Sequence, residues 1–237
     1  MIAGDVLKKK VLIEDVGMLE QIKNEVIRIG RQAQREGLCK HKAGNFSILD
    51  RESGYLVITP SGVDREVLRE EDMIVMDLDA NVIEHREGLR PSSEVLMHIA
   101  IYRARPDLMS IVHTHSKYAT VFAALNRPIP PFVNEMMALN NADQCIPVAP
   151  YGRTATPALA HNVAATMKNA DCILMQAHGA VAADAQSIDN AYLKACYIEE
   201  MAEVYHHILT ITGGKEPPLL PMEEFSQWAY PEEIRGI

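Results

Sequence analysis

Hydrophobic residues recur at helical spacing in three stretches of the chain. Between residues 18 and 36, apolar side chains occur every three or four positions, and Gly37 follows as a stop signal. Ser92 and Ser187 are of the residue type that caps helices, and they predict helices to about residues 105 and 211. In the helix after Ser92, the side chains expected to face inward are Val95, Leu96, Ile99 and Ala100.

Shorter apolar runs predict strands. They cover residues 46–50, 55–59, 73–78, 111–115 and 172–175. The first two runs flank the turn-like residues 50–54, so we expect a hairpin there. Helices and strands mix without a strict strand–helix–strand alternation, which favours a layered α/β or α+β domain with a partly antiparallel sheet.

Composition narrows the class of protein. The 237 residues are 48% apolar and 23% charged, as in an ordinary globular chain of one domain. The net charge of −9 provides no basic field for nucleic acid. The four cysteines form no CxxC motif and are expected to be free thiols. With neither an apolar run near ~20 residues nor a secretory signal, we expect a cytoplasmic protein away from membranes.

Three histidines form a candidate metal site. His113 and His115 are separated by one residue on an expected strand, so both lie on one face. His178 follows the strand at 172–175, and Gly179 after it suggests a tight turn. Three neutral imidazoles favour Zn²⁺ with one open position, although Mn²⁺, Co²⁺ or Fe²⁺ fit such donors. Each histidine taken alone also fits an ordinary structural role.

Three loops rich in small polar residues are candidates for binding an anion. They contain Gly44, Asn45, Ser61, Gly62, Ser92 and Ser93. Glycine allows close backbone approach, while serine and asparagine donate hydrogen bonds, and these groups are all formally neutral. The alternative is three ordinary turns. Glu94 follows the last of them, either complementing the helix dipole or serving as a metal ligand or a base.

The order of these motifs resembles the class II aldolase/adducin family, and within it the L-fuculose-1-phosphate aldolase branch. The motifs run Gly44-Asn45-x-Ser47, Thr59-Pro60-Ser61-Gly62, Pro91-Ser92-Ser93-Glu94, His113-x-His115 and His178-Gly179. The resemblance covers about residues 18–211, leaving 212–237 as a C-terminal tail of one domain spanning 1–237. It implies a three-layer α/β domain with a central, largely antiparallel sheet flanked by helices. It also implies a homotetramer with active sites at subunit interfaces.

The resemblance implies roles for the motif residues. His113, His115 and His178 would hold zinc, and Glu94 would be the catalytic acid/base and a metal ligand when substrate is absent. The phosphate would be held by Gly44, Asn45, Ser61, Gly62, Ser92 and Ser93. The implied activity is that of a lyase in carbohydrate metabolism. It would reversibly cleave a fuculose-1-phosphate-like ketose to dihydroxyacetone phosphate and an aldehyde, with the divalent ion stabilising the enediolate.

The chain departs from this family pattern at one catalytic position. Met136 stands where the family has a tyrosine from the neighbouring subunit, and Glu135 is a nearby polar candidate. The family has a second tyrosine in its C-terminal tail, for which Tyr230 is a candidate counterpart to which no role is assigned.

Other activities on this scaffold stay open. They are decarboxylation of a phosphorylated oxo-sugar acid, dehydration of a methylthioribulose-1-phosphate-type substrate, and 4-epimerisation of a pentulose phosphate. The epimerases have aspartate at the position of Glu94, which argues against that activity. A non-enzymatic adducin-like module would have lost metal ligands, all of which are present here.

Overall fold

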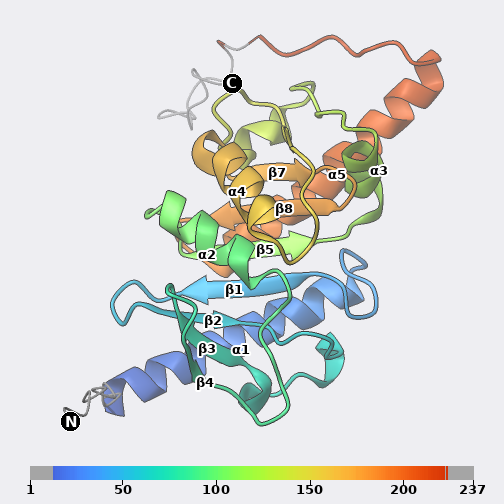
Figure 1. Cartoon of the computed structure of the whole chain (residues 1–237). Coiled ribbons are helices and arrows are strands. Elements are labelled where there is room, and N and C mark those ends of the chain that lie inside the picture. The colour runs from blue at the N-terminus through green and yellow to red at the C-terminus, as the bar shows by residue number, and fades with distance from the viewer. Residues whose placement is uncertain (1–12, 222, 224–237) are drawn as a thin grey trace, which may run out of the picture.

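The computed structural model describes residues 13–221 and residue 223 (Figure 1). Its described strands form one eight-stranded sheet in the order β4-β3-β2-β1-β5-β8-β7-β6. The strands are β1 (Asn45–Leu49), β2 (Tyr55–Ile58), β3 (Ile74–Asp77), β4 (Val82–Glu84), β5 (Ser110–Thr114), β6 (Val148–Ala149), β7 (Cys172–Met175) and β8 (Gly179–Asp184). Only the β6–β7 pair among them is parallel. The predicted largely antiparallel sheet is therefore confirmed.

The predicted hairpin is formed by β1 and β2. Its register places Ser47 opposite Ile58, and the strands continue into a turn closed by the amide of Gly54, which donates to the carbonyl of Asp50 at 2.9 Å. The Asp50 carboxylate accepts from the amides of Glu52 and Ser53, as short acidic residues do in turns. The turn is therefore fixed by its own local hydrogen bonds.

Helices cover both faces of the sheet. The α-helices are α1 (Ile13–Arg35), α2 (Val95–Ala104), α3 (Lys117–Ala124), α4 (Pro157–Thr166) and α5 (Ile188–Thr212). Short 3₁₀ helices are η1 (Arg65–Val67), η2 (Glu70–Asp72), η3 (Asn134–Leu139) and η4 (Met167–Asn169). Helices α1, α3 and α5 pack on one face, and α2 and α4 on the other. None of the helices in this part of the chain is both long and apolar enough to cross a membrane.

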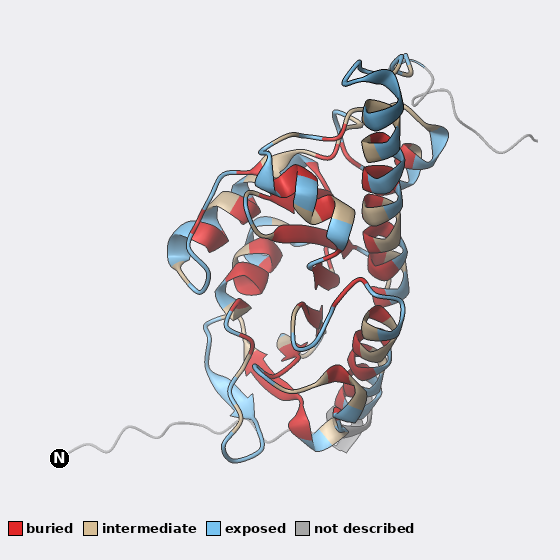
Figure 2. Cartoon of the chain, turned by 90° about the vertical axis from the view of Figure 1, so that its right-hand side faces the viewer, coloured by how far each residue is buried: buried red, intermediate tan, exposed pale blue. Residues whose placement is uncertain are grey.

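The two-sided packing explains the continuous apolar strands. Phe46 and Val112 point into the core beneath α1 and α5, whereas Leu49 and Ile111 point into the core beneath α2 and α4. A strand covered on both faces has no polar alternation to show. Figure 2 shows the result, with buried strands at the centre and helices that alternate buried and exposed positions.

Helix α2 begins later than the sequence predicts. Ser92 lies in a preceding turn, where its amide donates to the carbonyl of Thr59, so the backbone becomes helical only at Val95. The shift changes the buried face: Leu96 is 37% exposed, while Met97 is buried. The inward position predicted for Leu96 is wrong. By contrast, Ser187 caps α5 as predicted, accepting from the amide of Asn190.

Candidate active site

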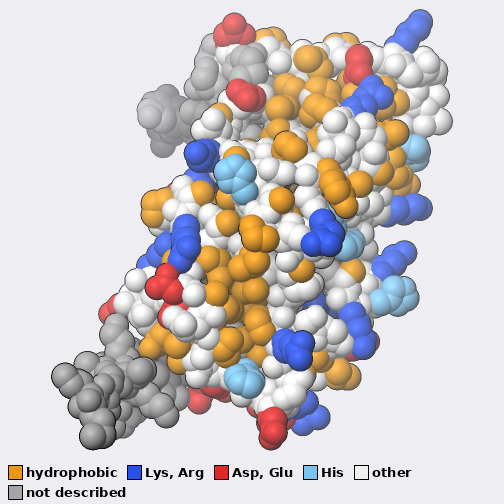
Figure 3. Space-filling view, viewed as in Figure 1, with side chains coloured by type: hydrophobic (Ala, Val, Ile, Leu, Met, Phe, Trp, Pro, Cys, Tyr) orange, Lys and Arg blue, Asp and Glu red, His pale blue; other side chains and the backbone are white. Residues whose placement is uncertain are grey.

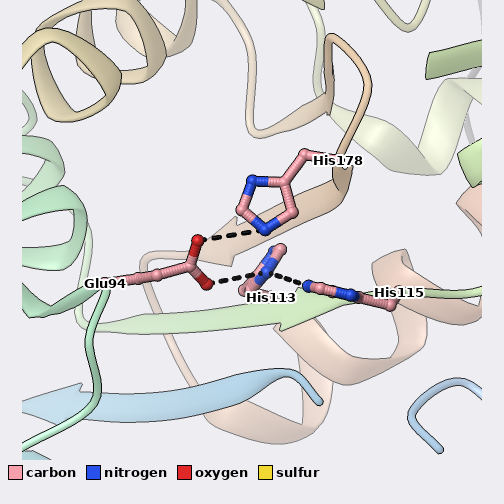
Figure 4. A group of neighbouring side chains, drawn as sticks. All are labelled: Glu94, His113, His115 and His178. Atoms are coloured by element: carbon pink, nitrogen blue, oxygen red, sulfur yellow. Dashed lines mark hydrogen bonds and ion pairs between the residues drawn. The ribbon is translucent and has the colours of Figure 1, made fainter. Parts of the chain in front are cut away.

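Three histidines and one glutamate converge where β5, the β7–β8 turn and the start of α2 meet (Figure 4). Strand β5 supplies His113, and His115 follows one residue beyond the strand's end, with the two Nε2 atoms 2.9 Å apart. His178 stands in the turn before β8. The two carboxylate oxygens of Glu94 lie 3.0 Å from Nε2 of His113 and 3.0 Å from Nε2 of His178. The structure thus brings all four predicted metal-site residues together.

Gly179 is required by close packing rather than by the turn. A Cβ atom at this position would lie 2.3 Å from the carbonyl oxygen of Thr114 and 3.3 Å from the ring of His115. Gly179 is not among the residues with positive φ; in this turn Ala177 has that conformation, at 57°. The predicted tight turn is therefore present, but Ala177 rather than Gly179 has its left-handed conformation, and the glycine instead lets β8 approach the histidine strand.

The donor set fits a divalent cation. Nδ1 of His113 lies 2.8 Å from the carbonyl oxygen of Ala180, which can only accept, so Nδ1 carries a hydrogen and Nε2 is the ring atom left for a metal. This Nε2 faces the carboxylate of Glu94 and the Nε2 of His115. The four ligand atoms all lie within 4.8 Å of one another. Ligands at ~2.1 Å from a tetrahedral zinc lie roughly 3.4 Å apart, so one ion would satisfy this set of acceptors.

Burial and mutual charge set the ionisation of the cluster. Burial lowers the pKa of His113, but Glu94 outweighs it and raises that pKa, so a metal ion would displace the proton of His113. Burial raises the pKa of Glu94, but His113 and His178 outweigh it and hold that pKa well below its usual range. Burial lowers the pKa of His115 to about 3, and the neighbouring imidazoles act in the same direction. The glutamate is therefore a carboxylate and His115 is neutral near pH 7, as metal ligands must be.

A buried hydrogen-bond chain orients Glu94. Asn45 Nδ2 donates to Glu94 Oε2 at 2.9 Å, and Asn45 Oδ1 lies 2.5 Å from Nε2 of His98. Nδ1 of His98 is in turn 2.6 Å from the hydroxyl of Ser47. Burial lowers the pKa of His98 to about 3, so the ring is neutral, donating to Asn45 and accepting from Ser47. Asn45 was predicted only to bind phosphate, and its contact with Glu94 was not predicted.

The six residues predicted to bind phosphate line one cavity of about 490 Å³ together with Glu94, His115 and His178. His113 is fully buried beside them. An antiparallel β-bridge between Pro60 and Pro91 joins two of the loops, and the amide of Ser61 donates to the carbonyl of Arg90. The sequence gave no indication of this pairing, because it joins segments 31 residues apart without a strand pattern.

Hydrogen bonding restricts how the serines can meet a ligand. The backbone amides of Ser61 and Ser92 are both used by neighbouring loop carbonyls, so only their hydroxyl groups are free to donate. The Ser92 hydroxyl oxygen also accepts from the amide of Glu94 at 3.3 Å. Gly62 has φ +74° and open space around its α-carbon, which leaves its backbone accessible from the cavity.

Two cations also line the cavity, Lys42 and the buried Arg65. Neither was predicted, because the residues predicted from the sequence to bind phosphate are all formally neutral. The available signal was position: Arg65 comes three residues after Gly62, but a Val-Asp-Arg-Glu stretch has the composition of a solvated turn. On the face in Figure 3, Lys and Arg side chains lie singly rather than as one field. The positive charge near the loops is therefore local.

The residues considered for the missing tyrosine lie elsewhere. Met136 is fully buried in the core of its own chain, and Glu135 is exposed on η3 and does not line the cavity. Tyr230 lies outside the described residues. The far side of the cavity is instead lined by Tyr151, Gly152 and Thr154, and the Tyr151 side chain is largely exposed there.

Comparison with known proteins agrees with this architecture. Residues 24–206 match the Class II Aldolase and Adducin N-terminal domain, and the chain belongs to that family. It is 35% identical to a 5-deoxy-D-ribulose 1-phosphate aldolase of Bacillus thuringiensis serovar kurstaki, over 90% of this chain and 95% of that one. It is also 35% identical to an L-fuculose phosphate aldolase of Escherichia coli O6:H1, over 87% and 91%. A solved L-fuculose 1-phosphate aldolase superposes with a TM-score of 0.81 at 35% identity, covering 87% of this chain and 93% of the other.

Proposed function

We propose that this protein is a zinc-dependent aldolase that reversibly cleaves a ketose 1-phosphate to dihydroxyacetone phosphate and an aldehyde. The observation that supports it best is one cavity lined by two chemically different groups of residues, called here its metal end and its loop end. The metal end is the cluster of Glu94, His115 and His178 with the buried His113 beside it, and the loop end is the three small-residue loops. A ketose 1-phosphate has a carbonyl next to its phosphate-bearing carbon, so a single molecule matches both ends.

The chemistry assigned to the residues follows from their contacts. A bound divalent ion would supply a Lewis acid that stabilises negative charge on substrate oxygens. Glu94 is a buried carboxylate held by Asn45, and we assign it to move the proton on the carbon that is released or attacked. The loops position the phosphate and take no part in bond cleavage.

The relatives narrow the substrate to a class. The two aldolases compared above are named for 5-deoxy-D-ribulose 1-phosphate and for L-fuculose phosphate. A ketose 1-phosphate cleaved between its third and fourth carbons gives dihydroxyacetone phosphate whatever the rest of the sugar is. We therefore assign the shared three-carbon fragment to the metal and phosphate ends, and the variable aldehyde to the side lined by Tyr151 and Thr154. We also propose, from family resemblance, that the enzyme works in the cytoplasm and that it is a homotetramer. Analytical ultracentrifugation would test the oligomeric state.

The proposal is tested with a panel of ketose 1-phosphates. The panel includes a 5-deoxypentulose 1-phosphate. The metal-loaded protein is expected to release dihydroxyacetone phosphate from at least one member of the panel. Chelation of the metal should abolish release, and adding back Zn²⁺, Mn²⁺ or Co²⁺ should restore it. Formation of carbon dioxide, a dehydrated product or an epimer, with no dihydroxyacetone phosphate across the panel, would overturn the aldolase assignment. A protein that holds no near-stoichiometric metal and stays inert after metal addition would overturn the enzyme itself.

A further inference from the structure

One buried side chain ties two of the cavity loops together. Arg65 is only 2% exposed, and its guanidinium donates to the carbonyl of Gly44 at 2.5 Å and of Val63 at 2.7 Å. Longer contacts reach the carbonyls of Lys42 at 3.4 Å and Pro60 at 3.5 Å. The arginine thus bridges the loop containing Gly44 and the loop containing Ser61 and Gly62. Arginine suits this role because its planar fork can donate to two partners at once.

The charge of Arg65 is not balanced by an ion pair within the described residues. Every described hydrogen-bond acceptor of its guanidinium is a backbone carbonyl, and its buried Nε has no partner. The adjacent Asp64 is engaged instead by the amide of Glu66 and the side chain of Gln34. Burial lowers the pKa of Arg65, which Cys39 and Asp64 only partly offset. A buried cation without a counterion is costly, so an anion in the cavity would be stabilised by it.

The loop that contains Gly44 also packs against β5, the strand of His113. A Cβ atom on Gly44 would lie 2.8 Å from the carbonyl oxygen of His113, and Gly44 has φ +74°, so its backbone passes directly against that strand. The next residue, Asn45, pairs with His113 in the sheet. The carbonyl that Arg65 binds therefore belongs to a loop packed directly against the strand of His113.

We propose that Arg65 is the positioning residue of the phosphate site. It holds the Gly44 loop at a fixed distance from the Ser61–Gly62 loop, and it supplies the local positive charge that a phosphate dianion needs in a chain of net charge −9. The inference rests on the proposed function for the source of the phosphate, a sugar phosphate. Arg65 acts through the loops, so its loss should weaken phosphate binding much more than turnover.

The test compares Arg65→Met and Arg65→Lys with the parent protein. Each metal-loaded protein is titrated with inorganic phosphate in a calorimeter, and metal-free samples in parallel separate phosphate on the metal from phosphate at the loops. Loss of the tie between the loops and of the nearby positive charge predicts a roughly 10- to 100-fold weaker dissociation constant for Arg65→Met. Arg65→Lys keeps the charge but loses the fork, and should be intermediate. Substrate KM should rise in parallel while kcat changes by less than about fivefold.

A matched control is Arg51→Met. Arg51 likewise donates to three backbone carbonyls, those of Tyr102, Arg105 and Leu108, but it does not line the cavity. This variant should bind phosphate normally. Circular dichroism and metal content establish that each variant is folded, and Arg65→Lys carries the test if Arg65→Met does not fold.

The outcomes separate this proposal from the proposed function. Unchanged phosphate affinity in both Arg65 variants overturns the role of Arg65, even if the protein is an active aldolase. A loss of kcat at constant KM overturns it too. Phosphate binding that depends on Arg65, in a protein that cleaves no ketose 1-phosphate, sustains the role of Arg65 and overturns only the aldolase assignment.

Discussion

The two ends of the cavity are chemical opposites. At the metal end, imidazole nitrogens and a carboxylate converge with their acceptor atoms facing one another, which calls for a cation. At the loop end, serine side chains, the open backbone of Gly62 and two cationic side chains line the cavity, which calls for an anion. A molecule carrying a chelating carbonyl group and a phosphate satisfies both. Neither end alone supports a particular class of substrate, and the proposed one rests on the two together.

The ends also differ in how they are held. His113 lies within β5, which is paired on both sides. His115 directly follows β5 and His178 directly precedes β8, so the hydrogen bonds of the sheet hold all three ligands in place. Apart from Asn45, which begins β1, the loop end lies outside the strands and is held by single hydrogen bonds between loops, among them those from Arg65 to Gly44 and from Ser61 to Arg90. Chemistry is thus built on regular structure, and recognition on polar ties between loops.

The largest expected effect is at Glu94. Replacing it as Glu94→Gln removes the proton-transfer group but keeps the three imidazoles and the side-chain shape. We expect kcat to fall by about 10²- to 10⁴-fold with metal content largely kept, measured by release of dihydroxyacetone phosphate and by elemental analysis. Glu203→Gln, at an exposed position of α5, is the control and should be unaffected. Near-normal turnover in Glu94→Gln would refute its role as the base.

A glycine from each end tests the difference in packing. Gly179→Ala places a Cβ atom 2.3 Å from the Thr114 carbonyl, so β8 and the histidine strand must separate. We expect the free energy of unfolding to fall by about 1–3 kcal/mol, and metal affinity to fall with it. Gly62→Ala has no atom within 4 Å and pays only for its positive φ, about 1 kcal/mol.

Denaturant titration and competition with a chelator measure both quantities. Gly62→Ala should leave metal affinity unchanged. An equal fall in metal affinity in the two variants would mean that the metal end and the loop end are not held independently.

The last expected effect is on the pH dependence of stability and concerns His98, which binds Asn45 behind the metal end. Burial lowers the pKa of His98 from 6.5 to about 3, so below pH 6.5 the unfolded chain binds a proton that the folded chain does not. Stability from this group is complete above pH 6.5 and is lost as the pH falls toward 3. Between pH 6 and 4.5 the loss should approach about 1.4 kcal/mol per pH unit.

Urea unfolding at several pH values checks this slope. His98→Gln should flatten the dependence relative to the parent protein, whereas His161→Gln, at an exposed position of α4, should not. The same slope in His98→Gln and the parent would show that His98 is not the group responsible.

Local periodicity accounts for what sequence analysis got right. Alternation on β5 places His113 and His115 on one face before any tertiary contact is known, and serine chemistry marks the start of α5. Elements made of small residues were missed for the same reason. Strand β8 reads Gly-Ala-Val-Ala-Ala-Asp, and α4 is rich in alanine, so neither has a strong hydrophobic pattern.

By itself, the sequence determined which residue types are available: three imidazoles, one carboxylate and three loops of small donors in a fixed order. Tertiary structure alone decided that Glu94 faces His178, that Asn45 is turned toward Glu94, and that Met136 is buried. It also placed Arg65 beneath the loops. The physical reason is distance along the chain: a periodic pattern reports which face of an element a side chain occupies, whereas contacts between elements depend on how the cores on both faces of the sheet pack.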